Sequence, residues 1–143
     1  MKKTLLMICI ILNASLIFYF SHQPATVSAS QSGVISEFIV DRIINDDIEI
    51  SASEKEQMKK RVDEIVRDIA HVVIYIPLGL FSILLAGRKR AWLVLLVIGV
   101  YAATDEIHQI WVDGRAAQFI DWVKDMLGAG VGVLIGITWK AKV

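Results

Sequence analysis

The sequence predicts an all-α fold, a membrane-embedded four-helix bundle with a partly helical extracytoplasmic loop. Three observations support this fold class. The chain of 143 residues is 55% hydrophobic, its apolar residues gather in four blocks, and its lysines and arginines flank those blocks. Long apolar blocks with basic flanks are typical of integral membrane proteins rather than of a soluble core.

The four predicted spans cover about residues 4–20, 69–87, 91–111 and 121–139. A helix needs about 20 residues to cross a bilayer. The third and fourth blocks reach that length only if they include the polar residues at one of their ends. We therefore expect these polar ends to lie at a membrane interface.

Basic residues predict the orientation of the spans. Lys2 and Lys3 precede the first span, Arg88–Arg90 join the second to the third, and Lys140 and Lys142 follow the fourth. Four spans bring these three regions to one side, and cytoplasmic loops are enriched in lysine and arginine. Both termini are therefore predicted to be cytoplasmic.

The loop 21–66 then lies outside the cytoplasm. Within it, residues 34–44 have apolar side chains at helical spacing, which predicts an amphipathic helix at the membrane surface. Ser53 and Glu56 match a capping box that would begin a helix leading into the second span. The first span also resembles a cleavable secretory signal, because two lysines precede its apolar run and a small-residue stretch follows at 27–30.

Polar side chains gather at the extracytoplasmic ends of the spans. In a helical projection of the third span, Tyr101, Asp105 and His108 form one stripe, with Gln109 beside it and Glu106 pointing away. In the fourth span, Asp121 and Asp125 share a face with Gly128, Gly132 and Gly136. Small residues at this spacing allow close helix packing, so both aspartates are expected to face the bundle interior.

Several function classes find no support in the sequence. The formal net charge is zero, so no basic field indicates nucleic acid as a partner. The single cysteine, Cys9, excludes a disulfide within the chain. His71, His108 and Asp105 could form a divalent-metal site, but no fixed ligand spacing supports one. We therefore predict no metal and no cofactor.

Four segments together carry a resemblance to a known family. They are SHQ at 21–23, RDIAHVVIYIPLG at 67–79, DEIHQIWVDGR at 105–115 and FIDWVKDMLGAGVG at 119–132. In this order they resemble the VanZ-like family of small integral membrane proteins. One departure is that Asp125 stands where the family often has Asn.

The resemblance implies a single VanZ-like membrane domain over residues 1–143, in the bacterial cytoplasmic membrane. It also implies a link to resistance to the glycopeptide teicoplanin. The family motifs mark a proposed site, to which the helical projection adds His108 and Asp125. The residues matched by the motifs are Arg67, His71, Tyr75, Asp105, Glu106, Gln109, Arg115 and Asp121.

We expect these residues to form an extracytoplasmic polar pocket for an anionic headgroup or a lipid-linked envelope precursor, with membrane lipids as the other partners. Arginine binds phosphate or carboxylate groups well. One alternative is a membrane enzyme in which His71, with Asp105 or His108, performs acid–base chemistry on a lipid phosphoester or acyl bond. A second alternative is a structural or partner-recruiting protein. The sequence does not determine the oligomeric state.

Overall fold

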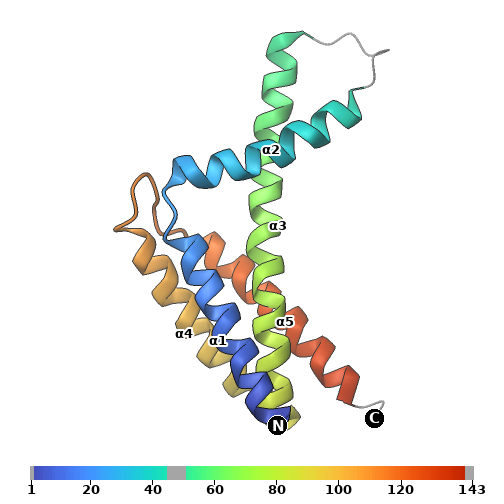
Figure 1. Ribbon diagram of the computed structural model, residues 1–143, viewed down its shortest axis with the longest axis vertical. Helices are drawn as coiled ribbons and strands as arrows, with labels where there is room; N and C mark the ends of the chain where they lie inside the picture. The colour runs from blue at the N-terminus through green and yellow to red at the C-terminus, as the bar shows by residue number, and fades with distance from the viewer. Residues whose placement is uncertain (1, 45–50, 141–143) are drawn as a thin grey trace.

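The chain folds into α-helices joined by short connections. The computed structural model describes residues 2–44 and 51–140, and its helices are drawn in Figure 1. In chain order they are α1 (Lys2–Ser21), α2 (Ala25–Ile43), α3 (Ala52–Ala86), the 3-10 turn η1 (Arg88–Arg90), α4 (Ala91–Gln109) and α5 (Phe119–Lys140). The predicted all-α fold is confirmed.

The 35-residue helix α3 is the central element of the fold. It contacts α1, α2, α4 and α5. Its N-terminal part extends beyond the other long helices, and α2 crosses it there (Figure 1). The helix ends at Gly87, whose φ of 88° favours glycine. The turn η1 then leads directly into α4.

The closest helix contact lies between α3 and α5. Gly128 and Gly132 on α5 lie against the backbone carbonyls of Val72 and Ile76 on α3, with no room for a Cβ atom at either glycine. In the same contact, Gly79 on α3 lies against the backbone of Ala129 on α5, again with no room for a Cβ atom. The predicted small-residue face therefore packs within the chain, against α3.

The molecule buries few apolar side chains and exposes many. Its core includes Ile17, Leu78, Ile98 and Val133, whereas large apolar side chains elsewhere on α1, α4 and α5 are exposed. Three described helical segments are long and apolar enough to cross a membrane: Lys2–Ser21, Ala52–Ala86 and Arg88–Gln109. A surface of this kind fits lipid rather than water, so the expected membrane character of the fold is supported.

Helix α5 does not belong to that set of three. It carries Asp121, Lys124 and Asp125 in its first turns and four glycines further on, and these residues lower its mean hydropathy. It nevertheless packs along α3 over much of its length (Figure 1). The prediction of a fourth membrane span at 121–139 therefore stays a prediction.

The predicted loop 21–66 is largely helical, and two of its details differ from expectation. The amphipathic helix is longer than 34–44, because Pro24 already starts α2 at its N-cap. The capping box involves Ser51 and Glu54, rather than Ser53 and Glu56. Both pairs have the capping-box spacing, and the helix begins at the earlier one.

Helix α2 is amphipathic and uses its small residues to approach α3. Ser32, Ser36 and Val40 are buried, whereas Val34 and Phe38 are exposed. Two ion pairs support this contact, Lys55–Asp41 at 2.9 Å and Lys59–Glu37 at 3.2 Å. Because α2 lies across α3, its exposed apolar side chains would lie along a membrane surface if α3 crosses the membrane.

Candidate functional site

Buried polar side chains gather where α1 ends, α4 ends, α5 begins and α3 passes between them. We call this region the polar end. Its buried polar residues are Ser21, Asp105, Glu106, Gln109 and Asp125. Buried carboxyl groups are rare unless they are paired or functional. Their concentration at one end makes this region the candidate functional site.

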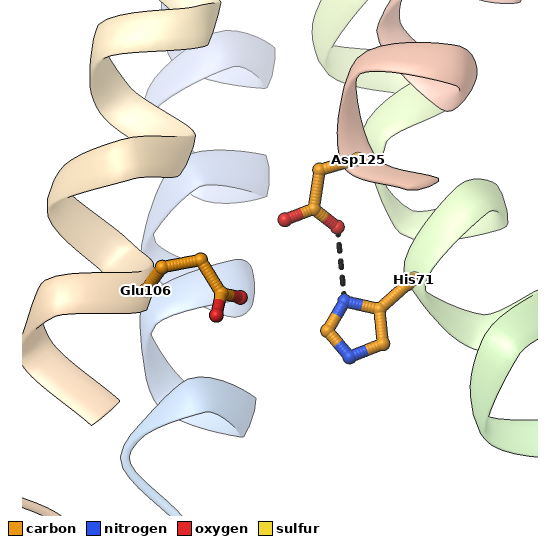
Figure 2. Close-up of side chains that lie close together, drawn as sticks. All are labelled: His71, Glu106 and Asp125. Carbon is orange, nitrogen blue, oxygen red and sulfur yellow. Dashed lines mark hydrogen bonds and ion pairs between the residues drawn. The ribbon is translucent and has the colours of Figure 1, made fainter. Parts of the chain in front are cut away.

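His71 on α3 and Asp125 on α5 form the central pair of the polar end. His71 Nδ1 and Asp125 Oδ1 lie 2.9 Å apart, and the imidazole N–H donates to the carboxylate (Figure 2). The Asp125 side chain is 1% exposed and that of His71 is 23% exposed. The close approach of Gly128 to Val72, one turn further along α5, brings the two helices near enough for this bond.

Glu106 lies inside the polar end, and the helical projection was wrong to point it away. Its side chain is 5% exposed, and Figure 2 shows its carboxylate directed from α4 toward His71 and Asp125. The backbone N–H of Gln118 donates to Glu106 Oε2 at 2.9 Å. This bond fixes Glu106 through the segment that connects α4 to α5.

The buried face of α4 differs from the face that the helical projection predicts. The buried stripe is Ala102, Asp105, Glu106 and Gln109, which faces the interior of the molecule. The projected stripe of Tyr101, Asp105 and His108 is rotated toward α1. Accordingly, the Tyr101 hydroxyl donates to the backbone carbonyl of Ala14 on α1 at 2.7 Å.

His108 also lies on the α1 side, apart from the His71–Asp125 pair. Nε2 of His108 and Nδ1 of His22 are 3.1 Å apart, and one ring donates its N–H to the other. The Phe18 ring packs against His108, with the ring centroids 4.8 Å apart. His22 was not among the predicted site residues, although the SHQ segment that contains it was part of the family resemblance.

Three buried oxygen atoms at the polar end have no hydrogen-bond partner among the described residues. They belong to the Tyr75 hydroxyl, Asp105 Oδ1 and Asp125 Oδ2. Gln109 is better satisfied, since its Nε2 donates to Ser21 Oγ at 3.0 Å. Unsatisfied buried oxygens are uncommon in folded proteins and are costly.

The predicted basic residues hold different positions. Arg115 donates from Nε to the backbone carbonyl of Gln23 at 3.1 Å and from Nη2 to that of Phe20 at 3.3 Å. Burial lowers the pKa of the Arg115 guanidinium from its ordinary value, and the positive charge of Arg67 lowers it further. Arg67 itself is half-exposed, with Nε 3.6 Å from Asp63 Oδ2. Arg67 is thus near enough for its charge to act on the guanidinium of Arg115.

Asp121 is engaged by a neighbouring lysine. Lys124 Nζ donates to Asp121 Oδ1 at 2.7 Å and also to Asp68 on α3. This network ties the start of α5 to α3. Asp121 therefore shares the positive charge of Lys124 with Asp68.

A cavity of about 350 Å³ opens between α4 and α5. Its walls are mostly apolar, and Glu106 provides a carboxylate among them. The lining residues are Ala103, Glu106, Ile107, Ala117, Gln118, Phe119 and Trp122. The cavity thus joins an apolar surface to the polar end.

A comparison with protein families finds a match over most of the chain. The model of the VanZ/LLP1 family matches residues 5–140. The chain belongs to the VanZ/LLP1 family. The predicted resemblance is thereby confirmed over nearly the whole sequence. No curated protein and no solved structure matches the chain.

In this VanZ/LLP1 chain, motif residues from different helices meet at the polar end. Tyr75, Asp105, Glu106, Gln109 and Asp125 are buried there. Partly exposed His71 lies beside Asp125, with Glu106 directed toward both (Figure 2). Such a set can bind a cation, transfer a proton or hold a polar headgroup. His71, Glu106 and Asp125 also have suitable atoms for a metal ion, since one atom of each lies within 4.8 Å of the others.

Proposed function

We propose that this VanZ/LLP1 protein binds the polar headgroup of a lipid-linked envelope precursor at the polar end, on the outer side of a bacterial cytoplasmic membrane. The observation that carries this proposal is the cavity between α4 and α5, whose apolar walls meet Glu106. A lipid has the matching chemistry, because an apolar chain is joined to a polar headgroup. Ligand cavities are usually apolar with a few polar groups that fix orientation.

The charge distribution supports an anionic headgroup. Arg67 is near enough for its charge to act on Arg115, and Arg115 is partly buried. Two guanidinium groups are well suited to a phosphate or carboxylate. The carboxylates lie deeper, so the headgroup would meet the arginines first.

The proposed orientation follows from the basic residues at the opposite end. Lys2 and Lys3 start α1, and Arg88–Arg90 form the turn between α3 and α4. Both regions lie at the far end of their helices from the polar end. With the positive flanks in the cytoplasm, the polar end faces outward, where glycopeptides such as teicoplanin meet envelope precursors. Binding there would alter teicoplanin susceptibility.

An enzymatic function is the second candidate, and the His71–Asp125 bond favours it. A buried carboxylate that orients an imidazole is a common arrangement for general acid–base catalysis. In such a reaction His71 would take a proton from an attacking hydroxyl group and return one to the leaving oxygen of a lipid phosphoester or acyl bond. A purely structural or partner-recruiting role is the remaining outcome of the test.

The test compares Arg67→Gln, His71→Ala and Asp105→Asn with the control Glu64→Gln, an exposed α3 residue. Membrane abundance and teicoplanin susceptibility are measured for each. Headgroup binding predicts normal abundance with altered susceptibility for Arg67→Gln, whose half-exposed side chain carries little of the packing. If all three site variants vanish from the membrane while the control remains, the polar end is structural and the proposal is wrong.

The enzymatic candidate has its own readout. Lipid extracts from cells that overproduce the protein are compared by mass spectrometry with extracts from cells that overproduce His71→Ala. A headgroup-modified lipid that appears only with the native protein supports catalysis. If the extracts from the two kinds of cell are identical and the site variants still change teicoplanin susceptibility, binding without catalysis is the function.

A further inference from the structure

Three side chains from three different helices converge at the polar end. His71 comes from α3, Glu106 from α4 and Asp125 from α5, and Figure 2 shows both acidic side chains and the imidazole directed toward a common space. One nitrogen or oxygen atom of each residue lies within 4.8 Å of the others. Glu106 and Asp125 are buried, at 5% and 1% exposure.

A second observation points to a ligand at this position. Asp125 Oδ1 is bonded to His71, yet its Oδ2 is fully buried without a hydrogen-bond partner among the described residues. The Tyr75 hydroxyl and Asp105 Oδ1 share this property. Such oxygens call for a bound group that accepts their lone pairs.

The charges around the cluster favour a bound cation. Asp105, Glu106 and Asp125 are acidic side chains, and His71 is in direct contact with one of them, Asp125. The nearby lysine and arginines make their closest contacts to groups outside the cluster. Lys124 binds Asp68 and Asp121, Arg67 pairs with Asp63, and Arg115 donates to backbone carbonyls. Buried carboxylates without a counter-charge are strongly unfavourable.

We propose that His71, Glu106 and Asp125 bind one divalent transition-metal ion, of the class of zinc or iron. One imidazole and two carboxylates suit these ions, whereas Mg²⁺ and Ca²⁺ prefer oxygen ligands alone. The inference goes beyond the proposed headgroup ligand and does not depend on it, because the ion is held by the chain's own residues.

To hold the ion through His71 Nδ1 and Asp125, the site would release the proton that His71 now donates to Asp125, and the ion would take its place between the two side chains. Ligand bonds of about 2.0–2.1 Å in a tetrahedral zinc site bring ligand atoms to roughly 3.3 Å from one another. The His71–Asp125 distance of 2.9 Å is already short, so the main movement falls to the longer Glu106 side chain. Three protein ligands leave a coordination position open, as catalytic zinc sites do.

The experiment titrates the full chain with Co²⁺ in nanodiscs of phosphatidylcholine, after removal of metal with a chelator. Every protein carries Cys9→Ser, so that this thiol does not contribute. Visible absorption reports Co²⁺ coordination, and competition with Zn²⁺ gives the zinc affinity. The expected result is one ion for each chain, with affinity at least about tenfold weaker in Glu106→Gln and in Asp125→Asn.

Glu106→Gln keeps the His71–Asp125 bond, so it separates loss of a ligand from loss of folding. The exposed Glu64→Gln is the matched control and should bind as the native chain does. Absence of saturable binding in the native chain would refute the proposal. A second result would also refute it: Co²⁺ binding that is lost in His22→Ala but unchanged in Asp125→Asn. The ion would then be bound by the His22–His108 pair. The nanodiscs contain no envelope precursor. The metal titration therefore gives the same result whether or not the protein binds a precursor headgroup.

Discussion

The close contact between α3 and α5 can be tested with two substitutions on the same helix. Gly132→Ala introduces a methyl group against the backbone carbonyl of Ile76, whereas Gly130→Ala introduces one where no atom lies within 4 Å. Both replace a helical glycine by alanine, so the change in helix propensity cancels between them. The difference in their stability therefore measures the steric effect alone.

Overpacking of a tight contact typically costs about 1–3 kcal/mol. At about 1.4 kcal/mol for each factor of ten, the ratio of folded to unfolded protein should fall by roughly 5- to 150-fold in Gly132→Ala relative to Gly130→Ala. The free energy of unfolding is measured by titration with a denaturing detergent in mixed micelles. Equal stability of the two variants would refute the close approach of α3 to α5.

Two further predictions concern the start of α3 and the topology. Ser51→Ala should speed hydrogen exchange of the Glu54 amide severalfold, because that amide donates to the Ser51 side chain. The bonds from Ser51 lower the pKa of Glu54 from 4.5. The cap therefore contributes stability above pH 4.5, and this stability is lost as the pH falls through the lowered pKa. NMR shifts of the Glu54 amide that stay constant below pH 4.5 would contradict this prediction. With Cys9→Ser as the background, a cysteine at Lys89 should react with a membrane-impermeant thiol reagent only from the cytoplasm, and one at Asp113 only from outside; the reverse pattern would overturn the proposed orientation.

The sequence was sufficient to locate the long helices, because their apolar blocks and charged flanks are strong local signals. The predicted 69–87 segment is the C-terminal part of α3, and the predicted 91–111 segment corresponds to α4, which ends at Gln109. The glycine face of α5 was also predictable, since spacing of four residues places small side chains on one side of a helix. Its partner helix was not predictable, because many helices could fill that position.

The interior of the polar end was harder to predict. A helical projection states which residues of α4 share a face, but it does not state which neighbour that face meets. Tyr101 and His108 meet α1, whereas Glu106 meets α3 and α5. Both faces carry polar residues, so polarity alone could not distinguish them. The buried stripe from Ala102 to Gln109 would have been the better guide, since it contains the small residue Ala102.

The bond between His71 and Asp125 has a consequence for biosynthesis. The two residues are 54 positions apart, so a ribosome working at about 5–20 residues per second needs roughly 3–11 s to add the second after the first. During that interval α3 has neither its carboxylate partner nor the glycine surface of α5. A nascent chain therefore carries His71 without its carboxylate partner until α5 has been made.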